Sequence, residues 1–432
     1  MALTEPTTSH TCTELPRCPA TTPGAITAHG AGEPGGLYAH LRREHPVFHD
    51  PELDVWVVTR HHDIDTVLRD ASGTFSTTLG YVPLQRLCPA AQAILEGSGA
   101  LPVLSSLDPP HHGRFRRQMT AVFPTTERRM NDLDALLQEE TTRAAREFAA
   151  RPCHTGDLVE EWARPLATAV LGRLTGLPAQ DQPAIMDRAA ALSHLVWGHI
   201  DDAAQVTAAH ALADLFSSCL ALTEQRSRTA HGNDLITGWL THQDTDEHPF
   251  STHEVASTLM EVLITNAEIT PRLLANTLYR LLTTGTYEEI HRTDRWPEAV
   301  AETLRHDPPL AGWLRSTTRD IHLSGTQIPA GARLLLLLAS AGRDEDHRLT
   351  EPDIHQTRRT SQPPTVAFGA GIHYCPGAAY TRHLAHHALT TLADTCPHLT
   401  LTRPDRCHPD TWPRNAALRA PTQLPAAWQP MR

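Results

Sequence analysis

Ten residues, from Phe368 to Gly377, constrain this chain more than any other segment; they read FGAGIHYCPG. Gly369 and Gly371 permit a tight turn and a close approach of another group to the backbone. Cys375 then stands directly before a predicted helix, and the N–H groups and dipole at such a helix start stabilise a thiolate. The segment therefore favours a cysteine that acts as a ligand over one that only packs in a core.

The rest of the chain predicts a mainly α protein with small β sheets. Apolar residues recur at spacings of three and four, as in helices, and short apolar runs follow Leu310. Residues 1–35 are rich in Thr, Pro and Gly and predict a flexible leader, which leaves 36–432 as a single domain. The predicted helices span 36–44, 62–70, 121–151, 158–174, 183–223, 251–284 and 378–396, and the predicted strands span 47–48, 55–59, 321–323, 326–328 and 333–338.

Charge and hydropathy exclude several classes of protein. All 37 basic residues are arginine, against 49 acidic residues, and the net charge of −12 disfavours a nucleic-acid binder. No apolar run reaches the roughly 18 residues of a membrane span, and the first residues carry no secretory signal. Eight cysteines without a C-x-x-C pair favour reduced thiols. The sequence thus predicts a soluble, cytoplasmic protein.

Histidine is abundant, with 28 residues, and most of it needs no functional explanation. His383 and His387 have the i, i+4 spacing that suits zinc on a helix. The sequence shows no third ligand beside them, so a solvated helix face is the favoured interpretation.

A stabilised thiolate in a glycine-lined loop is what axial ligation of haem iron requires. The pattern Phe-Gly-x-Gly-x-His-x-Cys-x-Gly resembles the signature of the cytochrome P450 family, and the resemblance covers nearly the whole folded chain. It implies the cytochrome P450 fold, haem b as cofactor, and Cys375 as the axial ligand of the iron. Phe368, Gly369 and His373 stand at signature positions and are expected to contact the haem.

The resemblance extends to the family's Glu-x-x-Arg motif. Glu302 and Arg305 stand about 70 residues before Cys375 and share one face of a predicted helix. The family adds an arginine from a later loop; Arg359 fits this position best, and Arg358 remains possible. We expect these residues to have a structural role.

A second set of residues resembles the family's clamp for the haem propionates. His112 and Arg116 lie four residues apart on one predicted helix, and Arg315 and His373 are expected to complete the clamp. Two carboxylates need cations or donors when they are partly buried, which explains these residue types.

The chain departs from the family in the helix expected above the haem. Related proteins carry Ala-Gly-x-(Asp/Glu)-Thr-Thr, whereas this chain reads Thr265-Asn-Ala-Glu-Ile-Thr-Pro271. Glu268 takes the acid position, and Ile269 replaces the alcohol that assists proton delivery to dioxygen. Thr265, one turn earlier on the same face, is the predicted compensation. Pro271 is expected to free the carbonyl of Ala267 and to kink the helix.

The same helix predicts part of a substrate pocket. If its register is as assumed, one stripe faces the haem, and further walls come from the segment 79–107, the loop 310–314 and a late strand. The predicted pocket residues are Thr258, Glu261, Val262, Leu310, Trp313 and Leu418.

These features predict a haem-thiolate monooxygenase that oxidises a small organic substrate, with bacterial natural-product biosynthesis as the expected setting. The chain shows no flavin or iron–sulfur domain, so a separate ferredoxin and ferredoxin reductase are the expected electron donors to a monomeric enzyme. Arg114 and Arg117 are the predicted contacts for the ferredoxin. A non-hydroxylating oxidase that couples or cyclises its substrate, a peroxide-driven enzyme and a haem-binding sensor are the alternatives.

Overall fold

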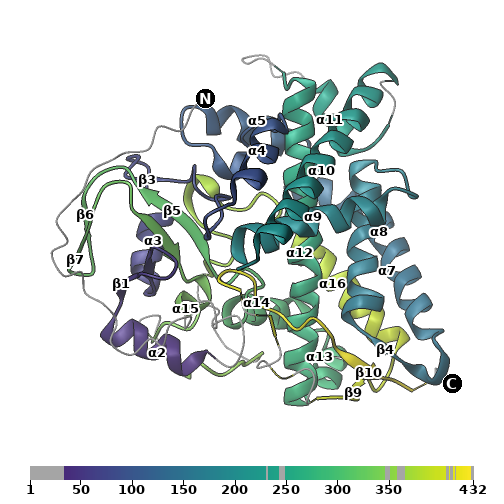
Figure 1. Cartoon of the computed structure of the whole chain (residues 1–432). Helices are drawn as coiled ribbons and strands as arrows, with labels where there is room; N and C mark the ends of the chain where they lie inside the picture. Colours follow the sequence, from purple (N-terminus) through teal and green to yellow (C-terminus); the bar gives the residue numbers. More distant parts are fainter. Residues whose placement is uncertain are drawn as a thin grey trace.

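The computed structural model describes residues 34–229, 232–242, 249–345, 351–357, 365–404, 408, 412–413 and 415–429. Nearly all of the predicted leader, together with Arg358 and Arg359, lies outside these residues. Most of the helices lie on one side of the molecule around the long helix α12 (Thr252–Thr284), and the larger sheet lies on the other side together with a few shorter helices (Figure 1).

The helices surround α12 and differ widely in length. Within the described residues, some of them are connected by the short 3₁₀ turns η1 (Leu104–Ser106), η2 (Pro152–His154) and η5 (Gly371–His373) and by the π-helical turn η3 (Val159–Ala163). The α-helices are α2 (Gly35–Glu44), α3 (His61–Leu68), α4 (Pro89–Gly97), α5 (His111–Val122), α6 (Glu127–Asn131), α7 (Asp134–Ala149), α8 (Arg164–Thr175), α9 (Gln182–Trp197), α10 (Asp202–Thr229), α11 (Leu235–Thr241), α12 (Thr252–Thr284), α13 (Tyr287–Thr293), α14 (Trp296–His306), α15 (Leu338–Ala341) and α16 (Ala378–Thr395).

Local sequence defines both ends of α12. Ser251 accepts a hydrogen bond from the backbone N–H of Glu254, whose carboxylate accepts one from the N–H of Ser251, which forms a capping box. Gly285, with φ of 68°, ends the helix in the left-handed conformation that glycine adopts easily. The helix continues through Pro271 and packs against α8, α9, α10, α14 and α16.

In the part of the chain that the structure describes, ten short strands form three sheets. A five-stranded sheet has the order β1-β2-β8-β5-β3, in which only β2 and β8 are parallel; a second sheet has the order β4-β10-β9, and β6 pairs with β7. The strands are β1 (Val47–Asp50), β2 (Val55–Val58), β3 (Phe75–Ser76), β4 (Thr155–Asp157), β5 (Trp313–Thr317), β6 (Ile321–Leu323), β7 (Thr326–Ile328), β8 (Arg333–Leu336), β9 (Thr400–Leu401) and β10 (Pro425–Ala427).

The five-stranded sheet is buried on both faces. Val57 and Leu335 pack in one apolar cluster, whereas their neighbours Trp56 and Leu334 pack in another. Successive strand residues point to opposite faces, so both faces of this sheet are covered. This burial explains why β2 and β8 read as continuous apolar runs without alternation.

Several predicted boundaries are wrong. The stretch 121–151 contains the end of α5 and then α6 and α7, because Phe123 is extended before Pro124, and a residue before proline disfavours the α region. The stretch 183–223 divides at Gly198 into α9 and α10, and 158–174 begins with η3. The strand predicted over 333–338 ends at Leu336, and α15 follows.

Helix α10 is the one helix, within the described residues, that is long and apolar enough to cross a membrane. Its most apolar window has a mean hydropathy of 1.3, and 39% of that window is buried inside the structure. Core helices of water-soluble proteins meet the same criterion, so this is weak evidence for a span. The helix packs against α4, α9 and α12.

Candidate active site

A large cavity brings the cysteine loop, α12 and several basic residues together. It encloses about 1320 Å³ of space free of protein atoms, including its open mouth. The sequence-predicted residues on its lining are Arg116, Glu261, Val262, Thr265, Ile269, Leu310, Trp313, Arg315, Phe368, Gly369, His373 and Cys375.

The loop that carries Cys375 depends on its glycines. Gly369 and Gly371 have φ of 69° and 65°, in the left-handed region. A Cβ on Gly371 would lie 2.6 Å from the carbonyl oxygen of Leu68, so a larger residue has no room there. The backbone N–H of Cys375 donates to the carbonyl of Phe368 at 2.9 Å, which closes the loop before α16 begins.

The thiol of Cys375 is held by opposing influences. Burial raises the pKa of this thiol, while a hydrogen bond from the backbone of Gly377 and the charge of Arg116 act to lower it. The expected stabilisation of a thiolate at the helix start is therefore present, but burial outweighs it. A metal cation at the sulfur reverses the balance, because a coordinating thiol is deprotonated.

Basic residues gather at one part of the cavity. The guanidinium of Arg116 donates to the carbonyl of Tyr374 at 2.6 Å, and the rings of His112 and His373 lie 4.3 Å apart between centroids. Burial, followed by Arg315, lowers the pKa of His373 to about 3. Burial likewise lowers the pKa of Arg315 to about 10.

These basic residues fit the propionates of a haem. Nε2 of His112 is buried and has no hydrogen-bond partner among the described residues. Arg315 is 5% exposed, and within the same residues its side chain donates only to the carbonyl of Leu314. A buried donor and a buried cation are costly without acceptors, which an anionic ligand supplies. The donor set and the cysteine loop therefore fit haem.

Besides Glu261, the cavity face of α12 carries three polar residues: Thr265, Asn266 and Thr270. Thr265 donates its hydroxyl proton to the carbonyl of Glu261 at 2.9 Å. Asn266 and Thr270 also line the cavity, and the hydroxyl of Thr270 lies 3.4 Å from the amide oxygen of Asn266. The sequence analysis missed Asn266 and Thr270, although their i, i+4 spacing from the predicted stripe was a usable signal.

Glu268, the predicted catalytic acid, does not line this cavity. Its carboxylate forms an ion pair with Arg272, with Nε at 3.0 Å, and a longer one with Arg164 at 3.6 Å. Adjacent residues on an α-helix point about 100° apart, so Ile269 faces the cavity while Glu268 turns toward α8.

Two predicted pocket residues also lie elsewhere. Thr258 is buried on the same stripe of α12 but does not line the cavity. At this level of the helix, the backbone N–H of Leu101 donates to the hydroxyl of Ser257. Leu418 forms an isolated β-bridge with Leu310. Of these two residues, Leu310 lines the cavity and Leu418 does not. His112 is not part of the lining, and its ring contacts the ring of His373 at a tilt of 60°.

The buried carboxylate of Glu261 attaches a loop to α12. It accepts hydrogen bonds from the backbone N–H groups of Leu104 and Ser105, at 3.1 and 3.0 Å. Both residues belong to η1 and line the cavity. Burial raises the pKa of this carboxyl, while Ser105 and Leu104 act against the rise. Tyr81 lines the cavity nearby and meets Trp313 edge to face, with ring centroids 5.7 Å apart.

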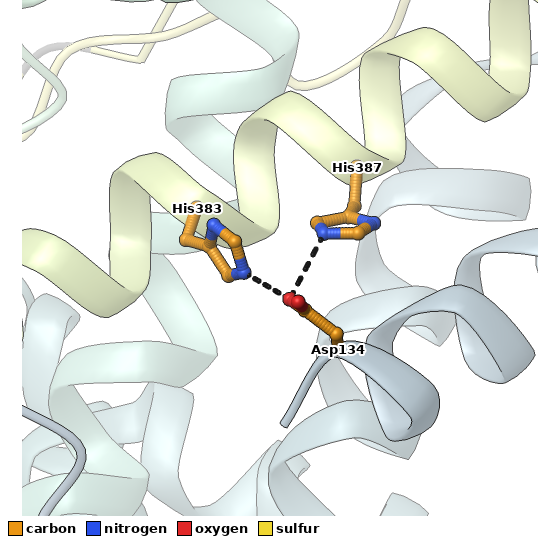
Figure 2. A group of neighbouring side chains, drawn as sticks. All are labelled: Asp134, His383 and His387. Atoms are coloured by element: carbon orange, nitrogen blue, oxygen red, sulfur yellow. Dashed lines mark hydrogen bonds and ion pairs between the residues drawn. The ribbon is translucent and has the colours of Figure 1, made fainter. Parts of the chain in front are cut away.

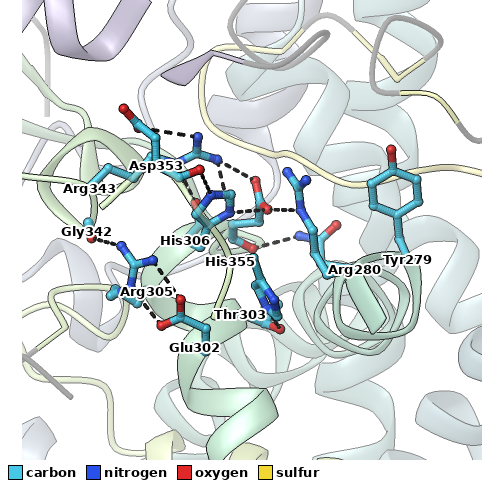
Figure 3. A network of polar contacts seen from close by, with 12 residues as sticks. Tyr279, Arg280, Glu302, Thr303, Arg305, His306, Gly342, Arg343, Asp353 and His355 are labelled. Atoms are coloured by element: carbon cyan, nitrogen blue, oxygen red, sulfur yellow. Dashed lines mark hydrogen bonds and ion pairs between the residues drawn. The ribbon is translucent and has the colours of Figure 1, made fainter. Parts of the chain in front are cut away.

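Glu302 and Arg305 form a buried, doubly hydrogen-bonded ion pair on α14. Two nitrogens of Arg305 each lie 2.8 Å from an oxygen of Glu302. Arg305 also donates to the carbonyls of Gly342, Pro352 and Ile354, which joins α14 to the loop that follows α15 (Figure 3). The predicted third partner, Arg359, lies outside the described residues.

A second carboxylate beside this pair was not predicted. Asp307 is fully buried and contacts three arginines as well as the ring of His306, at 2.7 Å. Burial pushes the pKa of Asp307 upward, but these partners outweigh it and hold the pKa well below its usual range. The arginines are Arg280 on α12, Arg343 after α15 and Arg419 in the C-terminal segment.

Arg114, one of the two predicted ferredoxin contacts, is paired within the molecule. Its guanidinium forms a bidentate ion pair with Glu254 at 2.6 and 3.0 Å and lies over the ring of Phe250. It therefore connects α5 to the start of α12. Arg117 is exposed on the same helix.

Comparisons with known proteins define the class of this molecule. A family model described as Cytochrome P450 matches residues 286–423. The chain is 31% identical over 408 residues to nocardicin C N-oxygenase of Nocardia uniformis subsp. tsuyamanensis, covering 90% of this chain and 94% of that protein. It is also 31% identical over 417 residues to cytochrome P450 monooxygenase PikC of Streptomyces venezuelae, covering 94% of each.

The fold agrees with these relatives. A solved structure of cytochrome P450 CREJ in complex with (4-ethylphenyl) dihydrogen phosphate is 28% identical, with a TM-score of 0.85, covering 93% of this chain and 98% of that one. The chain belongs to the cytochrome P450 family. It is a haem-dependent monooxygenase whose cofactor is haem b.

Proposed function

We propose that this enzyme oxidises a small, largely apolar organic substrate in natural-product biosynthesis, with Cys375 as the axial ligand of the haem iron. One observation carries the proposal: the sulfur of Cys375 and the Thr265–Ile269 face of α12 line one large cavity. When bound, the haem supplies the activation of dioxygen, which a thiolate ligand assists by donating electron density to the iron.

The basic residues would hold the haem through its propionates. Arg315 and Arg116 provide cations, and His112 and His373 provide ring nitrogens beside them. Phe368 and Gly369 line the same cavity and would pack against the macrocycle. Because these groups come from α5, β5 and the cysteine loop, haem binding would also join these three elements.

The distal residues would position the substrate and relay protons. Thr265 already donates its proton to the carbonyls of Glu261 and Val262, so toward the cavity its Oγ1 offers lone pairs that accept from a water or a substrate hydroxyl. Ile269 adds only apolar surface. A proton would therefore reach the reacting centre through a water or substrate group held at Thr265.

The lining supports a substrate with an apolar body and one or two polar groups. Val262, Ile269, Leu310 and Trp313 supply apolar surface, while Asn266 supplies an amide. Relatives are named for natural products: nocardicin C N-oxygenase, and an erythromycin C-12 hydroxylase of Saccharopolyspora erythraea that is 29% identical. These names support the proposed setting in secondary metabolism.

Electrons would come from a separate ferredoxin and ferredoxin reductase, and the enzyme would act as a cytoplasmic monomer. A second candidate function is oxidative coupling, cyclisation or a peroxide-driven reaction. The replacement of the usual alcohol by Ile269 favours this candidate. Product formed with hydrogen peroxide alone, and not with a surrogate ferredoxin pair and NADH, would identify a peroxide-driven reaction. Whether the product has gained an oxygen atom separates hydroxylation from coupling or cyclisation.

The thiolate assignment is tested by the spectrum of the reduced enzyme with carbon monoxide. The wild-type enzyme should give the band characteristic of thiolate-ligated haem, and Cys375→Ala should abolish it. Cys88→Ala, at a half-buried free thiol, is the matched control and should retain the band. A band that survives Cys375→Ala means that another residue is the ligand.

The substrate is tested by titrating the ferric enzyme with metabolites made by the products of neighbouring genes. A bound substrate should shift the Soret band to shorter wavelength, and turnover should give an oxidised product. An enzyme that binds none of these metabolites and consumes no NADH with any of them would contradict the proposed setting.

A further inference from the structure

Three side chains outside the haem cavity meet between α7 and α16 (Figure 2). Nε2 of His383 lies 2.5 Å from Oδ1 of Asp134, and Nε2 of His387 lies 3.5 Å from the same oxygen. The two imidazole rings are 4.7 Å apart between centroids. One ligand atom from each residue lies within 4.8 Å of the other two.

The helix geometry explains why the two histidines converge. Residues four apart on an α-helix share one face, so His383 and His387 both project from α16 toward α7. Asp134 is the first residue of α7, and 249 residues separate it from His383. Asp134 is therefore brought to the two histidines by the tertiary structure alone. It is the third candidate ligand that the sequence did not show beside His383 and His387.

We propose that Asp134, His383 and His387 bind a divalent transition metal ion, with zinc as the principal candidate. Two imidazole nitrogens and one carboxylate oxygen are ligands that zinc prefers, and three protein ligands leave a fourth position for water. Zinc–ligand bonds of about 2.0–2.2 Å place the ligand atoms of a tetrahedral site about 3.3 Å apart. Side-chain movements of about 1 Å would therefore bring these three ligand atoms to the distances that zinc requires.

The surroundings suit a site that exchanges with solvent. The side chains of His383, His387 and Asp134 are 28%, 21% and 47% exposed, so an ion can enter and a water can complete its coordination. The neighbouring His386 projects elsewhere, 3.7 Å from Asp294. The metal would attach the first turn of α7 to the helix that begins three residues after Cys375.

Zinc binding is measured on tag-free, chelator-treated holoenzyme, because a histidine tag would itself bind metal. Calorimetric titration with Zn²⁺ should reveal one site per haem, and elemental analysis after dialysis should give the same ratio. Because changes to the outer partners of metal ligands alone alter affinity by about 10–100-fold, His387→Ala should weaken binding at least about 100-fold. His386→Ala, one residue away on the same helix, should bind zinc like the wild-type enzyme.

Asp134→Asn keeps the shape of the side chain and removes its charge, so it tests the site even if a histidine variant folds poorly. It should retain its haem and its carbon monoxide band while losing most of its zinc affinity. Hydrogen exchange provides a second readout, since bound zinc should protect the start of α7 in the wild-type enzyme and in His386→Ala only. Absence of saturable binding, or equal binding in all four proteins, would overturn the proposal.

Discussion

Thr265 and Ile269 stand one turn apart on the face of α12 that lines the cavity, and only Thr265 carries a hydroxyl. At position 265 a hydroxyl therefore faces the cavity, whereas at position 269 only apolar groups do. Glu268 is paired with Arg272 and Arg164 and does not line the cavity, whereas Thr265 does.

Thr265→Val should therefore lower the amount of product formed per NADH and raise the release of peroxide. General acid–base contributions are typically about 10²–10⁴-fold, which sets the range for the loss in the rate of product formation. Ile269→Thr should leave coupling intact, or divert the enzyme toward plain hydroxylation. Product, NADH and peroxide are measured together with the native substrate.

Thr270→Val is the informative companion, because Thr270 also lines the cavity but its hydroxyl faces Asn266. A fully coupled Thr265→Val enzyme would assign the proton relay to substrate, to ordered water or to Thr270, and would reject the proposed role of Thr265.

At the scale of elements, α14 connects the haem-binding half of the molecule to the loops around it. Its ion pair, Glu302–Arg305, is buried, and Glu302 also accepts a hydrogen bond from the backbone of Gln356 at 2.7 Å. Burial pushes the pKa of Glu302 upward, but Arg305 outweighs it, so the pKa lies below its usual value. The carboxylate is therefore ionised at neutral pH.

Glu302→Ala should produce haem-poor or insoluble protein. Removing one partner of a buried ion pair leaves the other charge uncompensated and costs about 3–5 kcal/mol. Haem content per protein, and the yield of soluble enzyme, measure the effect. Glu298→Ala is the control on the same helix: its side chain is 44% exposed, and its pair with Arg295 should contribute about 0–1 kcal/mol. Normal haem loading in Glu302→Ala would refute this role.

At the scale of the whole molecule, stability depends on buried histidines that remain neutral. Burial and the charge of Arg343 lower the pKa of His306 to about 3. Burial lowers the pKa of His355 to about 4. Both rings lie next to the carboxylate network of Asp307 and Glu302 (Figure 3), so their protonation would place a charge inside it.

The sign of the pH dependence follows from these shifts. In the unfolded chain a histidine is protonated below about pH 6.5. In the folded protein His306 is protonated only near pH 3 and His355 near pH 4, so the folded state loses stability as the pH falls through this interval. The loss for His306 alone is about 2 kcal/mol at pH 5. Urea midpoints of the holoenzyme at pH 7.5 and pH 5 should therefore differ, and His306→Gln should reduce the difference. His210→Gln changes an exposed histidine and should leave the difference between the two urea midpoints unchanged. If His306→Gln shows the same difference as the wild-type enzyme, His306 is not the source of the pH dependence.

The class of the fold and the cysteine loop could be predicted because they depend on local patterns. Apolar spacing along α12 and the glycines beside Cys375 are visible in one stretch of sequence. The orientation of Glu268 could not be predicted, because a shift of one residue in the helical register turns a side chain by about 100°. Asp134 and Asp307 were missed for a different reason: their partners are far away in sequence, with no spacing that relates them.

The contacts of Asp307 also determine when the fold can be completed during synthesis. The buried charge cluster around Asp307 is complete only when Arg280, Arg343 and Arg419 have all been synthesised. Arg419 lies 44 residues after Cys375 in the chain. A ribosome therefore makes the entire cysteine loop before this group of charges can assemble.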